Sequence, residues 1–269
     1  MSIREVSPDG SADGPESTET PKAPPTRASY GIDQPGAIIQ LTAAAFITIV
    51  TGFVLSFLIP RSQVVAETIF LVGFPTIGFI ILVVSISLYW SSRLGKPREI
   101  DRVLRQLPWG GSEIVVDVGC GRGLMTIAAA KRLVDGIAIG TDIWRARDLT
   151  GNYPHSVETN AVIEGVADKV IAIKSDARFL PFDDESVDVS MSSMVIHIIG
   201  RWSDRAGALD ELIRITKPGG RIAIVDSGNG GDYAKFLRSR GITDIKLSRL
   251  RVRSFPPLHT LSARKPFSS

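Results

Sequence analysis

The chain of 269 residues carries a formal net charge of +3, is 44% hydrophobic and contains one cysteine. A single cysteine excludes an intrachain disulfide, and so small a positive charge gives no reason to expect a nucleic acid partner. The length allows one full α/β domain plus something smaller, and a mean hydropathy of +0.16 requires an unusually apolar segment within it.

The N-terminal third divides into a polar tail and two apolar runs. Residues 1–36 are rich in Pro, Ser, Thr, Gly and acidic residues, so they cannot bury enough surface to offset their ordering entropy, and we expect a disordered tail. Residues 37–60 and 68–92 carry no charge, and each run exceeds the about 20 residues that cross a bilayer as a helix. We expect a two-helix transmembrane hairpin, the alternative being two buried helices in a soluble core.

The flanks of the second run predict its orientation. Tyr89 and Trp90 close the run where interfacial aromatic residues are expected, and Arg93, Lys96 and Arg98 begin a basic stretch directly after it. The positive-inside rule places this stretch in the cytoplasm. The globular remainder, residues 93–269, is therefore expected on the cytoplasmic side of a membrane.

The remainder begins with a predicted helix at Pro97, which carries apolar residues at helical spacing as far as Leu107 and ends at Pro108–Ser112. Strand-length apolar runs then alternate with helical patterns: strands near 113–118, 137–141, 170–174, 187–192 and 221–226, helices near 124–134, 154–164, 203–216 and 232–240. This alternation predicts an α/β fold with a Rossmann-like, doubly wound, mostly parallel sheet. Runs at 245–252 and 259–263 predict an antiparallel edge.

A glycine-rich loop links the first of these strands to the next helix. Gly119, Gly121 and Gly123 stand there, and glycines at such a turn let a ligand approach the backbone amides at a helix start. Their spacing is G-x-G-x-G. The dinucleotide pattern G-x-G-x-x-G is absent, which disfavours a nicotinamide dehydrogenase, and no nucleoside triphosphate loop is present. Asp142 ends the second strand, where a carboxylate can accept hydrogen bonds from ribose hydroxyls.

With Asp117 in front of it, the loop resembles motif I of the class I S-adenosylmethionine-dependent methyltransferases. Residues 180–189 resemble the "LPF…FDVV" segment of the small-molecule branch, and 212–222 resemble its "RVLKPGGRL" segment. The resemblance covers about residues 97–265. It is closest to bacterial membrane-anchored members, on the stretches 142–152 and 192–197, although Ile198 stands where relatives often have asparagine.

The resemblance implies S-adenosyl-L-methionine as the cofactor, with Asp176 contacting the adenine amino group and Ala177 lining the ring. The implied cofactor-binding set is Asp117, Gly119, Cys120, Gly121, Gly123, Asp142, Ile143, Trp144, Asp176, Ala177 and Ser193. Asp117 either contacts the ligand or serves the loop alone, and Trp144 packs either on the adenosine or on the following helix. His197 is the one catalytic candidate, as a general base, against a purely structural role.

The expected function is S-adenosylmethionine-dependent methyl transfer to a small, apolar or lipid-like acceptor, because the tether keeps the site close to a membrane. Residues 190–193 lack the Asn/Asp-Pro-Pro-Tyr/Phe stretch common in enzymes that methylate exocyclic amines. Metal binding is not expected, because the three histidines are scattered along the chain. The alternative is a catalytically inactive membrane-tethered binding or scaffold protein. The oligomeric state and the acceptor's identity are left open.

Overall fold

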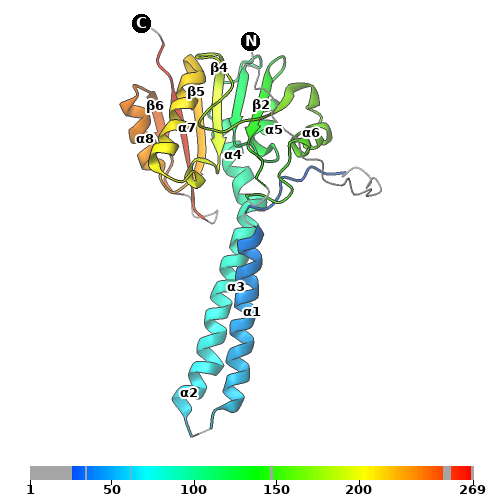
Figure 1. Ribbon diagram of the computed structural model, residues 1–269, viewed down its shortest axis with the longest axis vertical. Helices are drawn as coiled ribbons and strands as arrows, with labels where there is room; N and C mark the ends of the chain where they lie inside the picture. The colour runs from blue at the N-terminus through cyan, green and yellow to red at the C-terminus, as the bar shows by residue number, and fades with distance from the viewer. Residues whose placement is uncertain (1–25, 34, 61, 146–147, 251–255, 268–269) are drawn as a thin grey trace, which may run out of the picture.

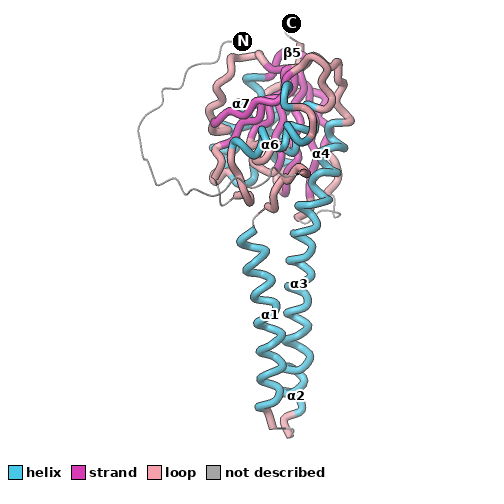
Figure 2. The backbone as a smooth tube through the Cα atoms, turned by 90° about the vertical axis from the view of Figure 1, so that its right-hand side faces the viewer, coloured by secondary structure: helices cyan, strands magenta, loops and turns pink. Residues whose placement is uncertain are grey.

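The computed structural model describes residues 26–267 except 34, 61, 146–147 and 251–255. An α/β domain forms one end of the molecule, and two long helices extend from it side by side (Figures 1 and 2). The domain is organised around a seven-stranded sheet whose helices lie on both faces.

The strands are β1 (Ile114–Val118), β2 (Ile137–Asp142), β3 (Val170–Lys174), β4 (Val187–Ser193), β5 (Thr216–Ser227), β6 (Thr243–Leu247) and β7 (Leu258–Arg264). Their order in the sheet is β3-β2-β1-β4-β5-β7-β6. Strands β1 to β5 pair in parallel, and β7 pairs antiparallel with both β5 and β6. The predicted Rossmann-like sheet with an antiparallel edge is confirmed. β6 ends at Leu247, and residues 251–252 of the predicted run lie outside the described residues.

Five helices cover the sheet: α4 (Lys96–Leu104), α5 (Leu124–Ala130) and α6 (Pro154–Ile163) on one face, α7 (Trp202–Ile215) and α8 (Gly230–Ser239) on the other. Side chains alternate between faces along a strand. In β1, Val115 packs in the core beneath α4 and α5, whereas Val116 and Val118 pack in the core beneath α7 and α8. The same alternation directs Asp117 toward α5.

The order of the strands places a topological switch point between β1 and β4, where open α/β sheets form a ligand crevice beyond the carboxyl ends of the strands. The glycine loop follows β1 and the Met194–Val195 turn follows β4, so both meet at this point. Gly119 has φ +75°, and a Cβ there would overlap the Val195 side chain. Glycine is therefore required at this position for both reasons.

The projecting helices form a hairpin. The first is α1 (Pro35–Leu58), and the second runs unbroken from Val64 to Leu104. It consists of α2 (Val64–Thr68), the π-helical turn η1 (Ile69–Gly73), α3 (Phe74–Trp90), the π-helical turn η2 (Ser91–Gly95) and α4. Both helices are long and apolar enough to cross a membrane by length and composition alone. Large apolar side chains face outward from them, Phe57 being 86% and Ile39 69% exposed.

The sequence pattern predicted a new helix at Pro97, and this is wrong because the helix from the hairpin continues through that residue. A proline ring clashes with the carbonyl four residues earlier and lacks an N–H donor. Turn η2 ends two residues before Pro97, and η1 ends two residues before Pro75. The wider i→i−5 bonding of a π-turn accommodates both defects. The hairpin is consequently joined to the domain by continuous helix instead of a loop.

The prediction of a disordered tail as far as residue 36 also fails for residues 26–33, which pack on the domain; residues 1–25 lie outside the described part. The Ser29 N–H donates to Asn160 Oδ1 (2.9 Å), and the Tyr30 hydroxyl donates to Glu164 (3.1 Å). Asp33 pairs with Lys96 at 2.9 Å. These polar contacts, together with the packing of Tyr30 against the core, hold the segment on the domain, and composition alone gives no measure of them.

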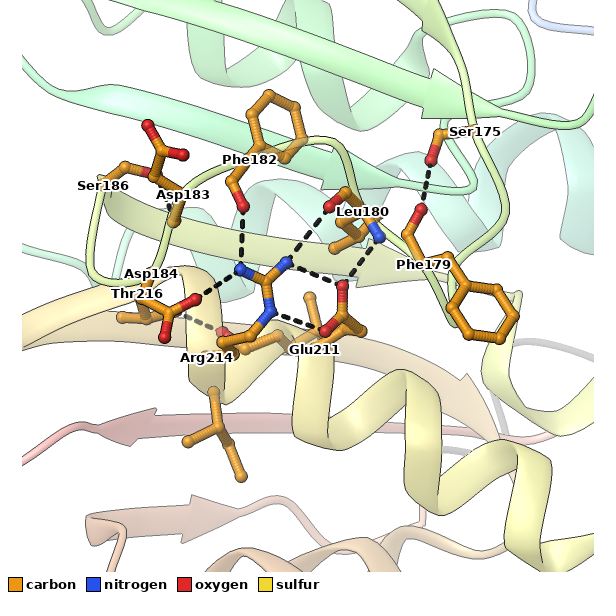
Figure 3. A network of polar contacts seen from close by, with 12 residues as sticks. Ser175, Phe179, Leu180, Phe182, Asp183, Asp184, Ser186, Glu211, Arg214 and Thr216 are labelled. Carbon is orange, nitrogen blue, oxygen red and sulfur yellow. Dashed lines mark hydrogen bonds and ion pairs between the residues drawn. The ribbon is translucent and has the colours of Figure 1, made fainter. Parts of the chain in front are cut away.

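Two of the family-like segments meet away from the sheet's carboxyl edge, in the polar network of Figure 3. Arg214 of α7 donates to the carbonyls of Phe182 (2.8 Å) and Leu180 (3.1 Å) and pairs with Asp184 (2.7 Å). Glu211 pairs with Arg214 and also accepts the Leu180 N–H (2.7 Å). These contacts raise the pKa of Arg214 further. The network fixes the 180–186 loop against α7.

The hairpin interface yields a test of its packing. Gly78 of α3 is buried against α1, where an added Cβ would lie 2.5 Å from Ile49 Cγ1 and 2.8 Å from the Ala45 carbonyl oxygen. We expect Gly78→Ala to destabilise the hairpin by about 1–3 kcal/mol through overpacking. Denaturation in detergent micelles, followed by helical circular dichroism, measures the change.

Gly73→Ala is the matched control, because a Cβ there meets only Ile69 Cγ2 at 3.9 Å. It should be neutral or stabilise by up to about 1 kcal/mol, the helix propensity gain of alanine over glycine. Equal effects of the two substitutions would contradict close packing at Gly78.

Candidate functional site

A cavity of about 660 Å³ opens at the carboxyl ends of β1 to β4. Most of the predicted site residues line it: Asp117, Gly119, Cys120, Gly121, Asp142, Ile143, Asp176, Ala177, Ser193 and His197. Gly123 and Trp144 do not. The parallel strands bring these side chains together, because their carboxyl ends share one edge of the sheet.

The carboxylate of Asp142 joins the end of β2 to the glycine loop. It accepts the Gly121 N–H at 2.8 Å and the Trp144 N–H at 2.7 Å. Burial raises the pKa of Asp142, although these two backbone amides act against that shift. A carboxylate with two oxygens has lone pairs left beyond these two bonds, and Asp142 lines the cavity.

Gly123 and Trp144 shape the loop from outside the cavity. Gly123 precedes α5 with φ +83°, a left-handed conformation that glycine adopts without strain. Trp144 also has a positive φ, +50°, and its indole N–H donates to the Gly121 carbonyl at 3.0 Å. The indole thus braces the loop, an arrangement that neither interpretation of Trp144 from the sequence anticipated.

Asp117 lies beneath the loop and is fully buried. The Thr126 hydroxyl of α5 donates to its Oδ2 at 2.7 Å, while its Oδ1 has no hydrogen-bond partner. Desolvation raises the pKa of Asp117 to about 7. Around neutral pH this carboxyl group can therefore hold or release a proton in response to a nearby charge.

The raised pKa of Asp117 predicts a pH-dependent stability. Between pH 4 and 7 the folded state keeps a proton that the unfolded state, with a pKa of 3.8, has lost. The free energy of unfolding contributed by this group is therefore fully present below pH 4 and is lost as the pH rises toward 7, by up to about 4 kcal/mol.

Asp117→Asn should flatten this part of the stability profile, because asparagine does not titrate. Urea denaturation of the full chain in micelles at a series of pH values measures the slope, with exposed Asp168→Asn as the control. Parallel profiles for Asp117→Asn and the wild type would contradict the assignment.

Buried polar atoms without partners gather at the cavity. Within the described residues four such side-chain atoms occur: Asp117 Oδ1, Arg122 Nε, Asn152 Oδ1 and Ser193 Oγ. All four residues line the cavity. Buried polar groups in native proteins are nearly always hydrogen-bonded, so unpartnered ones that share one cavity indicate a polar ligand.

Asp176 and Cys120 differ from the four residues with unpartnered atoms. Asp176 has hydrogen-bond partners, and the Cys120 thiol is unreactive. Arg178 donates to both carboxylate oxygens of Asp176 (3.0 and 2.7 Å), and these bonds lower the pKa of Asp176. Burial raises the pKa of Cys120 well above its usual value, so the thiol stays protonated. The Cys120 side chain packs against Gly140. A Cβ added at Gly140 would lie 2.8 Å from the Cys120 sulfur, so position 140 has no room for a side chain.

His197 has a buried carboxylate partner that the sequence analysis missed. Its Nδ1 hydrogen-bonds Asp226 Oδ1, and its backbone N–H donates to Asp226 Oδ2 at 3.0 Å. Asp226 is 2% exposed and also accepts the Ser227 N–H (2.9 Å) and the Tyr233 hydroxyl (3.2 Å). The one available signal was an acidic residue at the end of the fifth strand. The pair fixes the histidine ring with Nδ1 toward the protein.

No group of three or more His, Cys, Asp or Glu side chains in the described part of the chain is close enough to hold a metal ion. The arrangement is thus a cavity with acids, a guanidinium and an oriented imidazole, beneath a glycine loop.

Comparison with known proteins concerns the domain that holds this site. Residues 116–224 match the family described as "Methyltransferase domain". The chain is 31% identical over 133 residues to 27-O-demethylrifamycin SV methyltransferase of Amycolatopsis mediterranei, covering 48% of this chain and 44% of that protein. It is 28% identical over 127 residues to demethylmenaquinone methyltransferase of Lactiplantibacillus plantarum, covering 47% and 50%. The chain thus spans about half the length of the curated relatives it matches.

A solved structure supports the fold. Geranyl diphosphate C-methyltransferase from Streptomyces coelicolor superposes with a TM-score of 0.51 at 14% identity, over 68% of this chain and 79% of that one. At this identity the likeness concerns the fold alone. The matched domain, the motif order and the fold agree: residues 116–224 match a methyltransferase domain, and the chain is similar to class I S-adenosylmethionine-dependent methyltransferases.

Proposed function

We propose that the protein transfers a methyl group from S-adenosylmethionine to a small, apolar or membrane-associated acceptor. The observation that carries this proposal is the convergence of four unpartnered buried polar atoms on one cavity beneath the glycine loop. An inactive scaffold has no need to keep such atoms desolvated, because each costs about 1–3 kcal/mol when it stays unpaired.

The residues present fit the cofactor. The amino acid portion of the cofactor carries an ammonium and a carboxylate. Asp117 Oδ1, an unpartnered acceptor, would bind the ammonium, and Arg122 Nε, an unpartnered donor, would bind the carboxylate. Asp142 would bind the ribose hydroxyls, and Asp176 with Ala177 would hold the adenine. Gly119, Cys120 and Gly121 would give the ligand close access to the loop backbone.

His197 would act as the general base of the reaction. S-adenosylmethionine supplies an electrophilic methyl group on a sulfonium that is already a good leaving group. The chain must therefore orient the acceptor, exclude water and remove a proton where the nucleophile carries one. Asp226 is a positioning residue, since it binds Nδ1 and leaves Nε2 of His197 available to take that proton.

The membrane-associated acceptor is supported by the hairpin and by relatives. The continuous helix from Val64 to Leu104 would seat the domain directly at a bilayer surface, and by the positive-inside rule the basic residues that follow Trp90 would put the domain on its cytoplasmic side. Two relatives are named for methylating a rifamycin and a menaquinone precursor. Small organic acceptors of this kind are consistent with the cavity.

Calorimetric titration of the full chain in micelles tests the proposal. S-adenosylmethionine should bind with a dissociation constant on the order of micromolar, whereas NAD should not bind. Tritiated methyl should then pass from the donor into the chloroform-soluble fraction of a bacterial membrane extract. If a folded preparation binds neither ligand, the protein is better described as a membrane-tethered scaffold on a methyltransferase fold.

A further inference from the structure

A second cavity, of about 230 Å³, lies where the hairpin meets the domain. Ile38 of α1 and Leu88 of α3 line it from the hairpin side, and Met194 and Leu258 line it from the domain side. His197 lines this cavity and the larger one alike. The two cavities are therefore neighbours that share His197 in their lining.

The second cavity has an apolar wall and a polar rim. At the rim, Asp33 pairs with Lys96 at 2.9 Å, and the Ser92 hydroxyl donates to Asp33 Oδ2 at 3.1 Å. Asp33 and Lys96 line both cavities. These contacts tie the N-terminal segment to the base of the second helix, so the rim is built from both parts of the molecule. An apolar space with a few polar groups at one side suits an amphiphilic ligand.

Met194 separates the two spaces. It follows β4 with φ +60°, a left-handed conformation that an unbranched non-glycine residue rarely adopts, and its N–H donates to the Val225 carbonyl at 2.8 Å. Uncommon backbone conformations of this kind gather at functional sites. Met194 lines both cavities.

We propose that the second cavity binds the reacting head of a lipophilic acceptor that carries an acidic hydroxyl and enters from the bilayer along α1 and α3. The proposal rests on the methyl transfer proposed above. At 230 Å³ the space is smaller than the about 300–1,000 Å³ of pockets for drug-sized ligands. An acceptor with an apolar tail must therefore leave the tail outside, against the hairpin.

The surface below the cavity is suited to that tail. Ile39 and Ile86, one residue after Ile38 and two before Leu88, are 69% and 47% exposed. Exposed apolar side chains on both helices thus stand close in sequence to the residues that line the cavity. A tail that follows this path stays in lipid while the head reaches His197.

The proposed general base, His197, indicates that the acceptor group loses a proton as it reacts, and we infer that this group is a hydroxyl. The reaction forms an O–C bond to the methyl group as the C–S bond breaks, and the bonding pair stays on sulfur. The hydroxyl proton passes to Nε2 of His197, and the positive charge moves from sulfur to the imidazolium beside Asp226. A phenol-type hydroxyl is acidic enough to yield its proton to an imidazole as the bond forms.

Photolabelling of the full chain in phosphatidylcholine nanodiscs tests the proposal. The probe is a 4-alkylphenol that carries a diazirine on the alkyl carbon next to the ring, competed with unlabelled 4-dodecylphenol. We expect competed labelling of peptides that contain Leu258 and Ile38. Leu88→Trp, which fills the cavity, should lower the labelling of the Leu258 peptide by about tenfold, and Ile38→Trp provides a second filling variant.

Ile80→Trp is the matched control, since it places the same side chain at a 57% exposed position of the same helix, away from the residues that line the cavity. It should leave the labelling and the binding of S-adenosylmethionine unchanged. Uncompeted labelling confined to outward residues such as Phe46 and Phe79 would overturn the proposal, as would equal competition by 4-ethylphenol. Failure of the wild type to bind S-adenosylmethionine would instead overturn the proposed function, so the two failures are distinguishable.

Discussion

Replacing His197 by alanine is expected to lower methyl transfer by about 10²- to 10⁴-fold, the usual contribution of a positioned general base. S-adenosylmethionine binding should change little, because the cofactor's polar groups are assigned to Asp117, Arg122 and Asp142. The rate is measured as tritium transferred to the chloroform-soluble fraction of a membrane extract. Added imidazole should restore part of the activity, since it can occupy the vacated space and accept the proton.

His155→Ala is the matched control, because this histidine is exposed on α6 and stacks on Tyr153 away from the cavity. A loss of less than about threefold in His197→Ala would sink the assignment and indicate an acceptor that reacts without a base.

Asp226→Asn separates positioning from support of the fold. Asparagine keeps the size of the side chain but removes the negative charge that would stabilise a protonated His197. We expect kcat to fall by about 10- to 100-fold with KM for the methyl donor unchanged. Tyr233→Phe removes only one hydrogen bond to the same carboxylate, so it should retain nearly full activity if Asp226 acts through its charge.

The fold was predictable because its signals are local. The run Val170–Lys174 is bounded by turns and forms β3 at the predicted residues. Alternation of such runs with helical patterns leaves few topologies for a parallel sheet. The glycine loop was found for the same reason, since a strand, three glycines and a helix stand next to one another in the chain.

The His197–Asp226 pair was not predictable, because it depends on register. Ser193 of β4 lies opposite Val225 of β5, and this alignment brings two residues that are 29 positions apart into contact. The contact between the Trp144 indole and the Gly121 carbonyl was not predictable for a related reason. It needs a positive φ at Trp144, which no residue pattern indicates. Long-range geometry, in each case, decides what the side chain touches.

The junction of hairpin and domain shows a further limit of the sequence. Proline is common in the first turn of a helix, and Pro97 was interpreted as such a start, but a π-turn before it lets the helix from the hairpin continue. Leu88 and Lys96 line the second cavity from the part of this helix that precedes Pro97, and the helix then continues into the domain as α4. The lining of the cavity therefore comes from the hairpin and the domain together, a juxtaposition that no residue pattern indicates.

Asp142→Ala is expected to weaken S-adenosylmethionine binding by about 100-fold, which corresponds to about 2.7 kcal/mol. The carboxylate would lose its proposed bonds to the ribose. The backbone N–H groups of Gly121 and Trp144, which donate to this carboxylate, would also lose their acceptor. Each one that stays buried would cost about 1–3 kcal/mol of stability. Part of the loss is therefore a loosened loop. Calorimetric titration of the full chain measures it.

Asp142→Asn distinguishes the two contributions. Its single amide oxygen can still accept one of the two loop amides, so binding should be intermediate and the ligand-free melting temperature closer to that of the wild type. Asp168→Ala, on an exposed turn before β3, should leave binding unchanged. Wild-type affinity in Asp142→Ala at an unaltered melting temperature would contradict the assignment. Because Asp142 is the one carboxylate that holds both the glycine loop and the end of β2, such a result would move the ribose away from the switch point altogether.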